Sequence, residues 1–305
     1  MNYDAVLLIA FGGPTAPEDV RPFLENVTRG RGVPPERLAL VEQQYARIGG
    51  RSPLRDLTMR QARALEAMLA ASNRRLPVRV GMRNWHPYLH ETLADLARLG
   101  ARRVLGVILS SLRSEPSWER YIEDVRSARA HVPSAPEVDF APPWTRHPGF
   151  IDAVADRARL ALHAIPETER AWAPLVFTAH SLPVALAEAS SYVGDLSDAA
   201  HAVADRLGHP RYSIAYQSRS GRPQDPWLEP DVSDVLRRLG ADGDKHVVVV
   251  PIGFVVDHVE ILYDLDVLAR AAADAVGIEL HRATAVNDHP RFIAALTDIV
   301  ASHTG

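Results

Sequence analysis

Short apolar runs alternate with stretches of helical periodicity along most of the chain. The strands predicted in the first half are Ala5–Ala10, Val78–Met82, Val104–Leu109 and Val138–Phe140. Those predicted in the second half are Leu175–Thr178, Tyr212–Tyr216, Val247–Pro251 and Ile278–His281. Segments between them, such as Tyr88–Leu99 and His147–Ala164, carry apolar residues at helical spacing. This alternation predicts βαβ units and parallel sheets.

The two halves have the same number of predicted strands, four in each. The pattern therefore predicts an α/β fold of two doubly wound, Rossmann-like lobes with parallel four-stranded sheets. We expect a boundary near Pro142–Pro148, which gives lobes at 1–145 and 146–305, with a last helix that could pack back on the first lobe. Open parallel sheets bind ligands at the carboxyl ends of their strands. The loops expected to line a site therefore follow Ala10, Met82, Leu109, Thr178, Tyr216 and Pro251.

Composition narrows the chemistry that these loops can carry. The chain has 305 residues, 47% of them hydrophobic and 24% charged, which is enough to build a substantial core. A net charge of −4 without a Lys/Arg-rich run argues against nucleic acid as a partner. Because there is no cysteine, disulfides, thiolate zinc sites, cysteine-ligated clusters and catalytic thiols are excluded. The N-terminal apolar run is too short to span a bilayer and lacks the basic region of a signal peptide, so we expect a cytoplasmic protein without a transmembrane segment. A monomer is the default expectation.

His180 follows an apolar strand in the sequence VFTAHSLP (Val176–Pro183), two residues beyond the predicted strand end. The end of a strand holds a side chain in a fixed position, which suits a catalytic base or a metal ligand. An imidazole that caps the next helix or bonds a backbone carbonyl is an equally good interpretation of this position alone.

A second cluster, PIGFVVDHVEILYDLD (Pro251–Asp266), follows the most hydrophobic predicted strand. Helical spacing places Asp257, Glu260 and Asp264 on one face, whereas His258 and Asp266 point elsewhere. Acidic residues in a first turn also complement the helix dipole, and this is the structural alternative. Three stacked acids exceed what capping requires.

An imidazole opposite a column of carboxylates suits a borderline divalent ion such as Fe²⁺ only transiently, because so few protein ligands leave coordination positions open. His180 and the face of Asp257, Glu260 and Asp264 therefore form a candidate site for a transiently held metal. The same groups suit proton removal near neutral pH.

In the first half, Arg29 and Arg31, with Arg47 and Arg51 around Gly49-Gly50, form a basic cluster suited to binding carboxylates. Solvated surface arginines are the alternative.

Several motifs together resemble one family. They are FGGP after the first strand, ENVTRGRG, IGGRSPL, FTAHSLP, the QSRSGRPQDPWLEPDV stretch (Gln217–Val232) and the Pro251–Asp266 stretch. In this order they resemble ferrochelatases, most closely the actinobacterial type that acts on coproporphyrin III. The resemblance runs from about Ala5 to Phe292 and implies two Rossmann-like lobes with a cleft between them.

The resemblance also implies roles for individual residues. His180 would bind iron and accept pyrrole protons, with Glu260 opposite and Asp264 continuing an acidic path outward. The substrate-binding positions that it implies are Phe11, Arg29, Arg31, Ser52, Arg83 and Tyr121. The implied reaction inserts Fe²⁺, as a substrate, into a porphyrin in haem biosynthesis, most simply coproporphyrin III to give coprohaem. No tightly bound cofactor is expected.

Three departures from the family pattern qualify this expectation. Phe11 stands where some relatives have a metal-contacting tyrosine, and a phenyl ring cannot ligate a metal. Many actinobacterial relatives hold a [2Fe–2S] cluster through cysteines, and this chain has none. The segment Ser110–Tyr121 carries Arg113 and Glu115 where small or aromatic residues are typical.

Other functions remain open at the level of sequence. A non-catalytic porphyrin or haem carrier could use the same fold, although a carrier does not need an acidic path for protons. Protoporphyrin IX could replace coproporphyrin III as the substrate, and a cobalt chelatase acting on a corrinoid precursor is a further alternative.

Overall fold

The computed structural model describes residues 3–221 and 224–304, and their internal contacts divide into two compact units. The first unit comprises the described residues up to Ser110, Pro116–Pro143 and the chain from Ile293 onward. The second unit comprises Ser111–Glu115 and Trp144–Phe292. The chain therefore passes between the units more than once, and each unit is described by itself.

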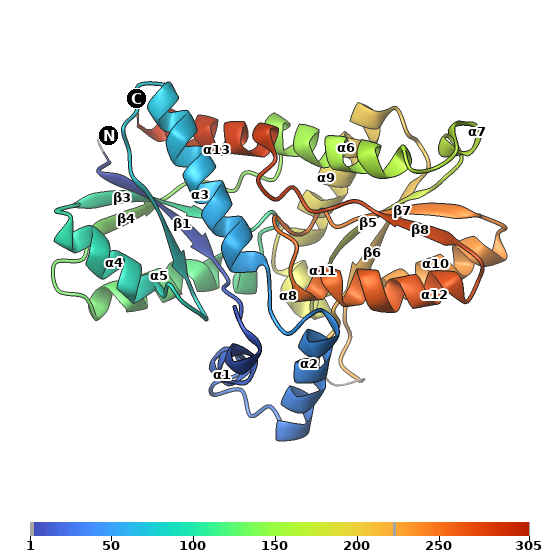
Figure 1. The fold of residues 1–305 in the computed structure, drawn as a ribbon, viewed down its shortest axis with the longest axis horizontal. Coiled ribbons are helices and arrows are strands. Elements are labelled where there is room, and N and C mark those ends of the chain that lie inside the picture. The colour runs from blue at the N-terminus through green and yellow to red at the C-terminus, as the bar shows by residue number, and fades with distance from the viewer. Residues whose placement is uncertain (1–2, 222–223, 305) are drawn as a thin grey trace. The chain divides into compact units, whose positions relative to one another are not determined.

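The first unit is built on a parallel sheet of order β2-β1-β3-β4 (Figure 1). Its strands are β1 (Ala5–Ala10), β2 (Val78–Met82), β3 (Arg103–Ile108) and β4 (Glu137–Phe140). Its longer helices are α1 (Val20–Val27), α2 (Pro35–Arg47), α3 (Leu54–Ala71), α4 (Leu89–Arg98), α5 (Glu119–Ala130) and most of α13 (Pro290–His303). Short 3₁₀ helices, η1 (Pro17–Asp19) and η2 (Glu115–Ser117), precede α1 and α5.

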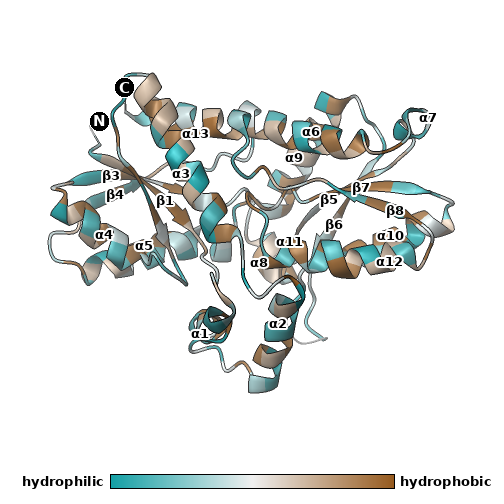
Figure 2. Cartoon of the chain, in the orientation of Figure 1, coloured by the Kyte–Doolittle hydropathy of each residue, from teal (hydrophilic) through white to brown (hydrophobic). Residues whose placement is uncertain are grey.

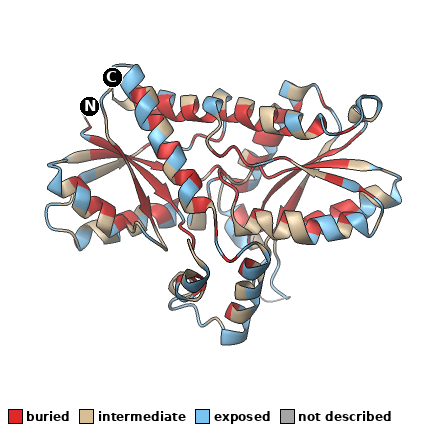
Figure 3. Cartoon of the chain, viewed as in Figure 1, coloured by how far each residue is buried: buried red, intermediate tan, exposed pale blue. Residues whose placement is uncertain are grey.

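Strand alternation explains how the first sheet is covered. Ala5, Leu7 and Ile9 of β1 point to one face, where they pack with the buried side chains of α4 and α5. All six residues of β1 are buried, as expected for the central strand of a parallel sheet (Figure 3).

The second unit repeats this design with a parallel sheet of order β6-β5-β7-β8. Its strands are β5 (Leu175–His180), β6 (Tyr212–Gln217), β7 (His246–Val250) and β8 (Glu279–Arg282). Its helical elements are α6 (Pro148–Leu162), α7 (Glu167–Arg170), α8 (Val184–Glu188), α9 (Tyr192–Leu207), α10 (Val232–Ala241), α11 (Val259–Leu262), the π-helix η3 (Asp264–Ala269) and α12 (Arg270–Asp274).

Helices lie on both faces of the second sheet (Figure 1). Val247, Val249 and Leu280 pack on one face with buried residues of α10, α11, η3 and α12. Helix α6 packs against β7 and β8, and α9 packs against β6 and α6. The hydropathy colouring shows the same design in the helices, which are brown on one side and teal on the other (Figure 2).

The predicted fold class, two doubly wound lobes with parallel four-stranded sheets, is confirmed. One strand end is corrected. The predicted strand Leu175–Thr178 continues to His180, because Ala179 and His180 pair in register with Tyr216 and Gln217 of β6. His180 is therefore the last residue of the strand itself. Among the described residues, no helix is long and apolar enough to cross a membrane.

Candidate active site

The second sheet has a topological switch point between its two central strands. From β5 the chain moves outward to β6 on one side and then returns to β7 on the other. Ligand sites of open α/β sheets form at such a point, beyond the carboxyl ends of the strands. His180 ends β5, and Glu260 lies in α11, the first helix after β7. The topology thus brings two candidates from distant parts of the chain to one place.

Gly253 lets the loop after β7 lie directly on β5. Its backbone N–H donates to the Thr178 carbonyl at 3.0 Å. A Cβ atom at this position would lie 2.6 Å from the Cβ and 2.7 Å from the Cα of Ala179, closer than van der Waals contact allows. Only glycine fits this close approach, which fixes the path of the chain from β7 towards Glu260.

His180 has its two ring nitrogens in different environments. Nδ1 lies 2.5 Å from the Ser181 carbonyl oxygen, so this nitrogen carries a proton and donates it. Nε2 lies 3.5 Å from Oε1 of Glu260. The side chains of His180 and Glu260 keep 29% and 38% of their surface exposed. In the neutral ring, the Nε2 lone pair is therefore directed towards the carboxylate and remains open to a ligand.

The two groups stabilise each other's charged form. Burial lowers the pKa of His180, but the charge of Glu260 and the hydrogen bonds to Glu260 and to the Ser181 carbonyl outweigh it and raise this pKa to about 9. Burial raises the pKa of Glu260, yet the positive charge of His180 prevails and lowers it to about 2. Without a bound ligand the pair is imidazolium and carboxylate at neutral pH.

Asp264 begins the π-helix η3, one turn after Glu260. Single π-turns inside helices are often found at functional sites. Burial raises the pKa of Asp264 to about 7; the negative charge of Glu260 also raises it, while a hydrogen bond from the Ser218 hydroxyl lowers it. Asp264 can therefore take up and release a proton at neutral pH.

The predicted acidic face is wrong in one member. Asp257 lies before α11, which begins at Val259, so helical spacing does not apply to it. Its carboxylate accepts hydrogen bonds from Arg282 at 2.9 Å and from the Asn287 amide at 2.8 Å. Arg282 also pairs with Asp266, with Nε 2.6 Å from Oδ1. Asp257 therefore belongs to a buried ion network beneath the site, and Glu260 and Asp264 are the remaining acids of the face.

Several residues around the site were not singled out from the sequence. The Tyr192 hydroxyl, at the start of α9, donates to the His180 carbonyl at 2.9 Å. The Gln217 amide donates to the Glu260 carbonyl. His258, which was expected to point away from the acidic face, caps α11, and its Nδ1 accepts from the Glu260 N–H at 3.2 Å. Gln217 and Ser218 stand in a motif that carried the family resemblance, which is the signal that could have found them. Tyr192 had no such signal.

The first unit contains its own hollow, of about 380 Å³, which gathers basic side chains. Arg29 and Arg31 after α1, Arg83 after β2 and Arg120 on α5 line it. Arg29 and Arg31 are exposed. Arg47 and Arg51 are not among the lining residues, so the predicted cluster of four arginines is not what lines this hollow.

Arg83, unlike Arg29 and Arg31, is enclosed by other side chains. Its guanidinium lies 4.3 Å from the ring centroid of Tyr121 and 5.8 Å from that of Phe11, and its Nε pairs with Asp124. Only 8% of the Arg83 side chain is exposed. Phe11 itself follows β1 and is 38% exposed. The structure thus brings Phe11, Arg83 and Tyr121 together in one stack.

Ser52 lies apart from that stack. It is buried, its N–H donates to the Pro14 carbonyl at 2.8 Å, and its hydroxyl accepts from the Leu54 N–H at 3.3 Å at the start of α3. A Cβ on Gly13 would lie 3.0 Å from the Ser52 hydroxyl. Ser52 therefore joins the loop after β1 to α3.

Comparison with known proteins shows the family to which this chain belongs. The ferrochelatase family model matches residues 3–304 of the chain. The chain belongs to the ferrochelatase family. The resemblance drawn from its motifs is thereby confirmed. A coproporphyrin III ferrochelatase from Mycolicibacterium smegmatis is 44% identical over 305 residues, which covers 98% of this chain and 89% of that protein.

Other relatives of this ferrochelatase-family chain agree. The coproporphyrin III ferrochelatase of Frankia alni is 45% identical, covering 97% of this chain and 79% of its own. Among solved structures, SirB from Bacillus subtilis with Fe³⁺ has a TM-score of 0.62 at 13% identity, covering 100% of this chain and 96% of its own. CbiX, described as the terminal enzyme for siroheme biosynthesis in denitrifying bacteria, has a TM-score of 0.55 at 16% identity, covering 98% of each chain. These two structures support the fold alone.

Proposed function

We propose that this member of the ferrochelatase family inserts Fe²⁺ into coproporphyrin III, with His180 and Glu260 as the groups that bind the iron. The observation that carries the proposal is the contact of His180 Nε2 with the Glu260 carboxylate, 3.5 Å apart at the switch point of the second sheet. One nitrogen and one carboxylate leave most positions of the ion open, as a metal that must move on to the porphyrin requires.

Proton removal follows from the same groups. Inserting a divalent ion into a free-base porphyrin releases two pyrrole protons. At neutral pH the free imidazole is protonated at Nε2, so iron binding there first displaces that proton. Once the iron has moved on, Nε2 is neutral and accepts the two pyrrole protons one at a time, because Nδ1–H already donates to the Ser181 carbonyl. Glu260 stabilises the imidazolium that results. Asp264, with a pKa of about 7, accepts each proton from the imidazolium and releases it to solvent, which returns the carboxylate to its starting state. Phe11 cannot ligate, so no oxygen ligand comes from that position.

Carboxylate binding is assigned to the first unit. Arg29 and Arg31 are exposed in the basic hollow and can bind propionate groups. Arg83 already pairs with Asp124, so its proposed role is to position the Phe11 and Tyr121 rings. Together the three side chains would form a wall of the porphyrin site, apolar at the rings and cationic at the guanidinium. Ser52 fixes the loop that carries Phe11. Coproporphyrin III has four propionates and protoporphyrin IX has two, so the arginines favour the former.

Anaerobic incubation of the protein with Fe²⁺ and each porphyrin, followed by the change in the Soret band, tests this function. We expect catalytic turnover of coproporphyrin III at a higher kcat/KM than that of protoporphyrin IX. Arg29→Gln and Arg31→Gln should each raise KM for coproporphyrin III by about three- to tenfold with little change in kcat, because exposed arginine contacts contribute modest binding energy. Arg47→Gln, outside the hollow, is the matched control. Stoichiometric binding of porphyrin without turnover would instead indicate a carrier.

A further inference from the structure

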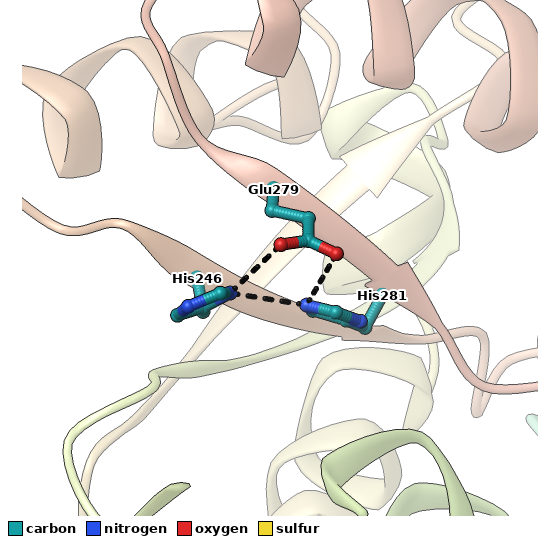
Figure 4. Close-up of side chains that lie close together, drawn as sticks. All are labelled: His246, Glu279 and His281. Atoms are coloured by element: carbon teal, nitrogen blue, oxygen red, sulfur yellow. Dashed lines mark hydrogen bonds and ion pairs between the residues drawn. The ribbon is translucent and has the colours of Figure 1, made fainter. Parts of the chain in front are cut away.

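A second cluster of ligating side chains lies in the second unit, at the opposite ends of the strands from His180. His246 begins β7 and Glu279 begins the edge strand β8, and the two are register partners (Figure 4). His281, two residues after Glu279, points to the same face because side chains alternate along a strand. β7 separates this cluster from the loop leading to Glu260 by five residues, about 15 Å of extended chain.

The distances between the ligating atoms suit a small ion. His246 Nδ1 lies 3.2 Å from His281 Nε2 and 3.5 Å from Glu279 Oε2, and His281 Nε2 lies 3.7 Å from Glu279 Oε1. Ligands held at about 2.0–2.1 Å in tetrahedral zinc sites are separated from each other by about 3.3 Å. The triangle formed by these three side chains is therefore close to one face of such a tetrahedron, and Glu279 is exposed enough to adjust.

A fourth residue orients the cluster. Glu169 of α7 has Oε2 3.3 Å from Nε2 of His246, the ring nitrogen on the far side from the cluster. A carboxylate that accepts the proton of one ring nitrogen leaves the lone pair of the other nitrogen for a metal, and ligating histidines commonly have such a partner. The side chains of His246 and His281 are only 13% and 9% exposed, so their rings are held in place.

Without a metal, one proton shared between His246 Nδ1 and His281 Nε2 satisfies both rings, and this hydrogen-bonded pair is the structural alternative.

We propose that His246, Glu279 and His281 bind a divalent ion of the zinc class, with solvent completing its coordination and Glu169 orienting His246. Two imidazoles and a carboxylate with an open position are typical ligands of Zn²⁺. The ion would join the edge strand β8 to β7, and it is distinct from the iron that the enzyme would insert at His180. Among the described residues, this is also where three metal-ligating side chains converge within 4.8 Å of one another.

Titration calorimetry with Zn²⁺ alone, on the untagged full chain freed of metal, tests the proposal. The His180 site could bind Zn²⁺ as well, so the reference protein carries His180→Ala and keeps this cluster intact. In that background we expect one Zn²⁺ per chain. His281→Asn should abolish binding, and Glu169→Gln should weaken it about 10- to 100-fold, as loss of an orienting carboxylate does elsewhere.

Two further variants keep the result interpretable. His201→Asn removes another imidazole of the second unit, which lies 3.3 Å from Asp205 and 3.2 Å from the Tyr212 hydroxyl, and should leave binding unchanged. Glu279→Gln alters a side chain that is 66% exposed, so the fold should survive and the affinity should fall at least tenfold. Zn²⁺ should raise Tm in the reference protein but not in His281→Asn. Equal stoichiometry and affinity in the reference, Glu279→Gln and His281→Asn proteins would overturn the proposal.

Discussion

His180 Nε2 faces the Glu260 carboxylate at 3.5 Å, while Nδ1 of the same ring donates to the Ser181 carbonyl. The backbone contact fixes which nitrogen is protonated, and the carboxylate stabilises the charge that develops when the other nitrogen accepts a proton. Because the two residues come from β5 and from the helix after β7, their contact depends on the close approach of these two segments.

That approach yields a first prediction, at Gly253. Gly253→Ala places a methyl group about where Ala179 lies, so the loop after β7 must shift away from β5. A displacement of about 1 Å in positioned groups can cost about 10²-fold in rate. We expect kcat to fall by about this factor in the anaerobic iron-insertion assay, with porphyrin binding retained.

Gly194→Ala is the matched control for this substitution. Gly194 lies in α9 of the same unit, and a Cβ there meets no described atom within 4 Å. Its replacement should leave kcat unchanged and stabilise the helix by about 0.5–1 kcal/mol. Equal rates for Gly253→Ala and wild type would show that the loop contact does not position the site.

Asp264 should control how the rate depends on pH. Its pKa is raised to about 7, so kcat should rise with pH as the carboxylate becomes free to accept a proton. Asp264→Asn cannot accept one, and we expect a kcat about 10²-fold lower whose dependence on pH around 7 is lost. A pH–kcat profile of the two proteins measures this, and an unchanged profile in Asp264→Asn would remove Asp264 from the proton path.

The same pKa shift predicts the effect of Asp264 on stability. A folded-state pKa above the unfolded value near 3.8 means that the folded protein binds the proton more tightly. The stability from this protonation is fully present below pH 3.8 and is lost as the pH rises towards 7. Asp264→Asn should therefore have a higher Tm than wild type at pH 8, and the difference should shrink as the pH falls towards 4.

The Arg282 network should matter for stability more than for chemistry. The Arg282 side chain is 12% exposed and bridges Asp257 and Asp266, so Arg282→Leu removes the ion-pair partner that the two carboxylates share. Breaking a buried pair in this way costs about 3–5 kcal/mol. Urea unfolding should show a loss of this size, whereas Arg237→Leu, which breaks an exposed pair with Asp234, should cost only about 0–1 kcal/mol. Similar losses for both would contradict the structural role.

Local patterns accounted for much of the fold and for part of the site. The apolar runs were sufficient to predict eight parallel strands. Position after a strand made His180 and the acidic face of Glu260 candidates, and the family motifs then indicated their roles. Helical spacing failed at Asp257 because the helix begins two residues later, and hydrophobic periodicity carries no information about where a first turn starts. The π-turn at Asp264 likewise leaves no signal in the spacing of apolar residues.

Contacts between segments that are distant in the sequence could not be predicted from these patterns. His246 and His281 are 35 residues apart and meet only because β7 and β8 are neighbours in register. The hollow that gathers Arg29 and Arg83 depends in the same way on how the loop after α1 packs near β2. Such pairings follow from strand order and tertiary packing, which the spacing of residues along the chain does not determine.

The rate of Fe²⁺ insertion into coproporphyrin III by His180→Ala, measured anaerobically beside porphyrin binding by fluorescence quenching, tests the central claim most directly. We expect kcat to fall by at least about 10²–10⁴-fold, the usual contribution of a positioned acid–base group, while the porphyrin still binds. His201→Ala, an exposed imidazole of the same unit, should insert iron at the wild-type rate. Wild-type turnover by His180→Ala would contradict the assignment of His180 as the group that meets iron and accepts pyrrole protons.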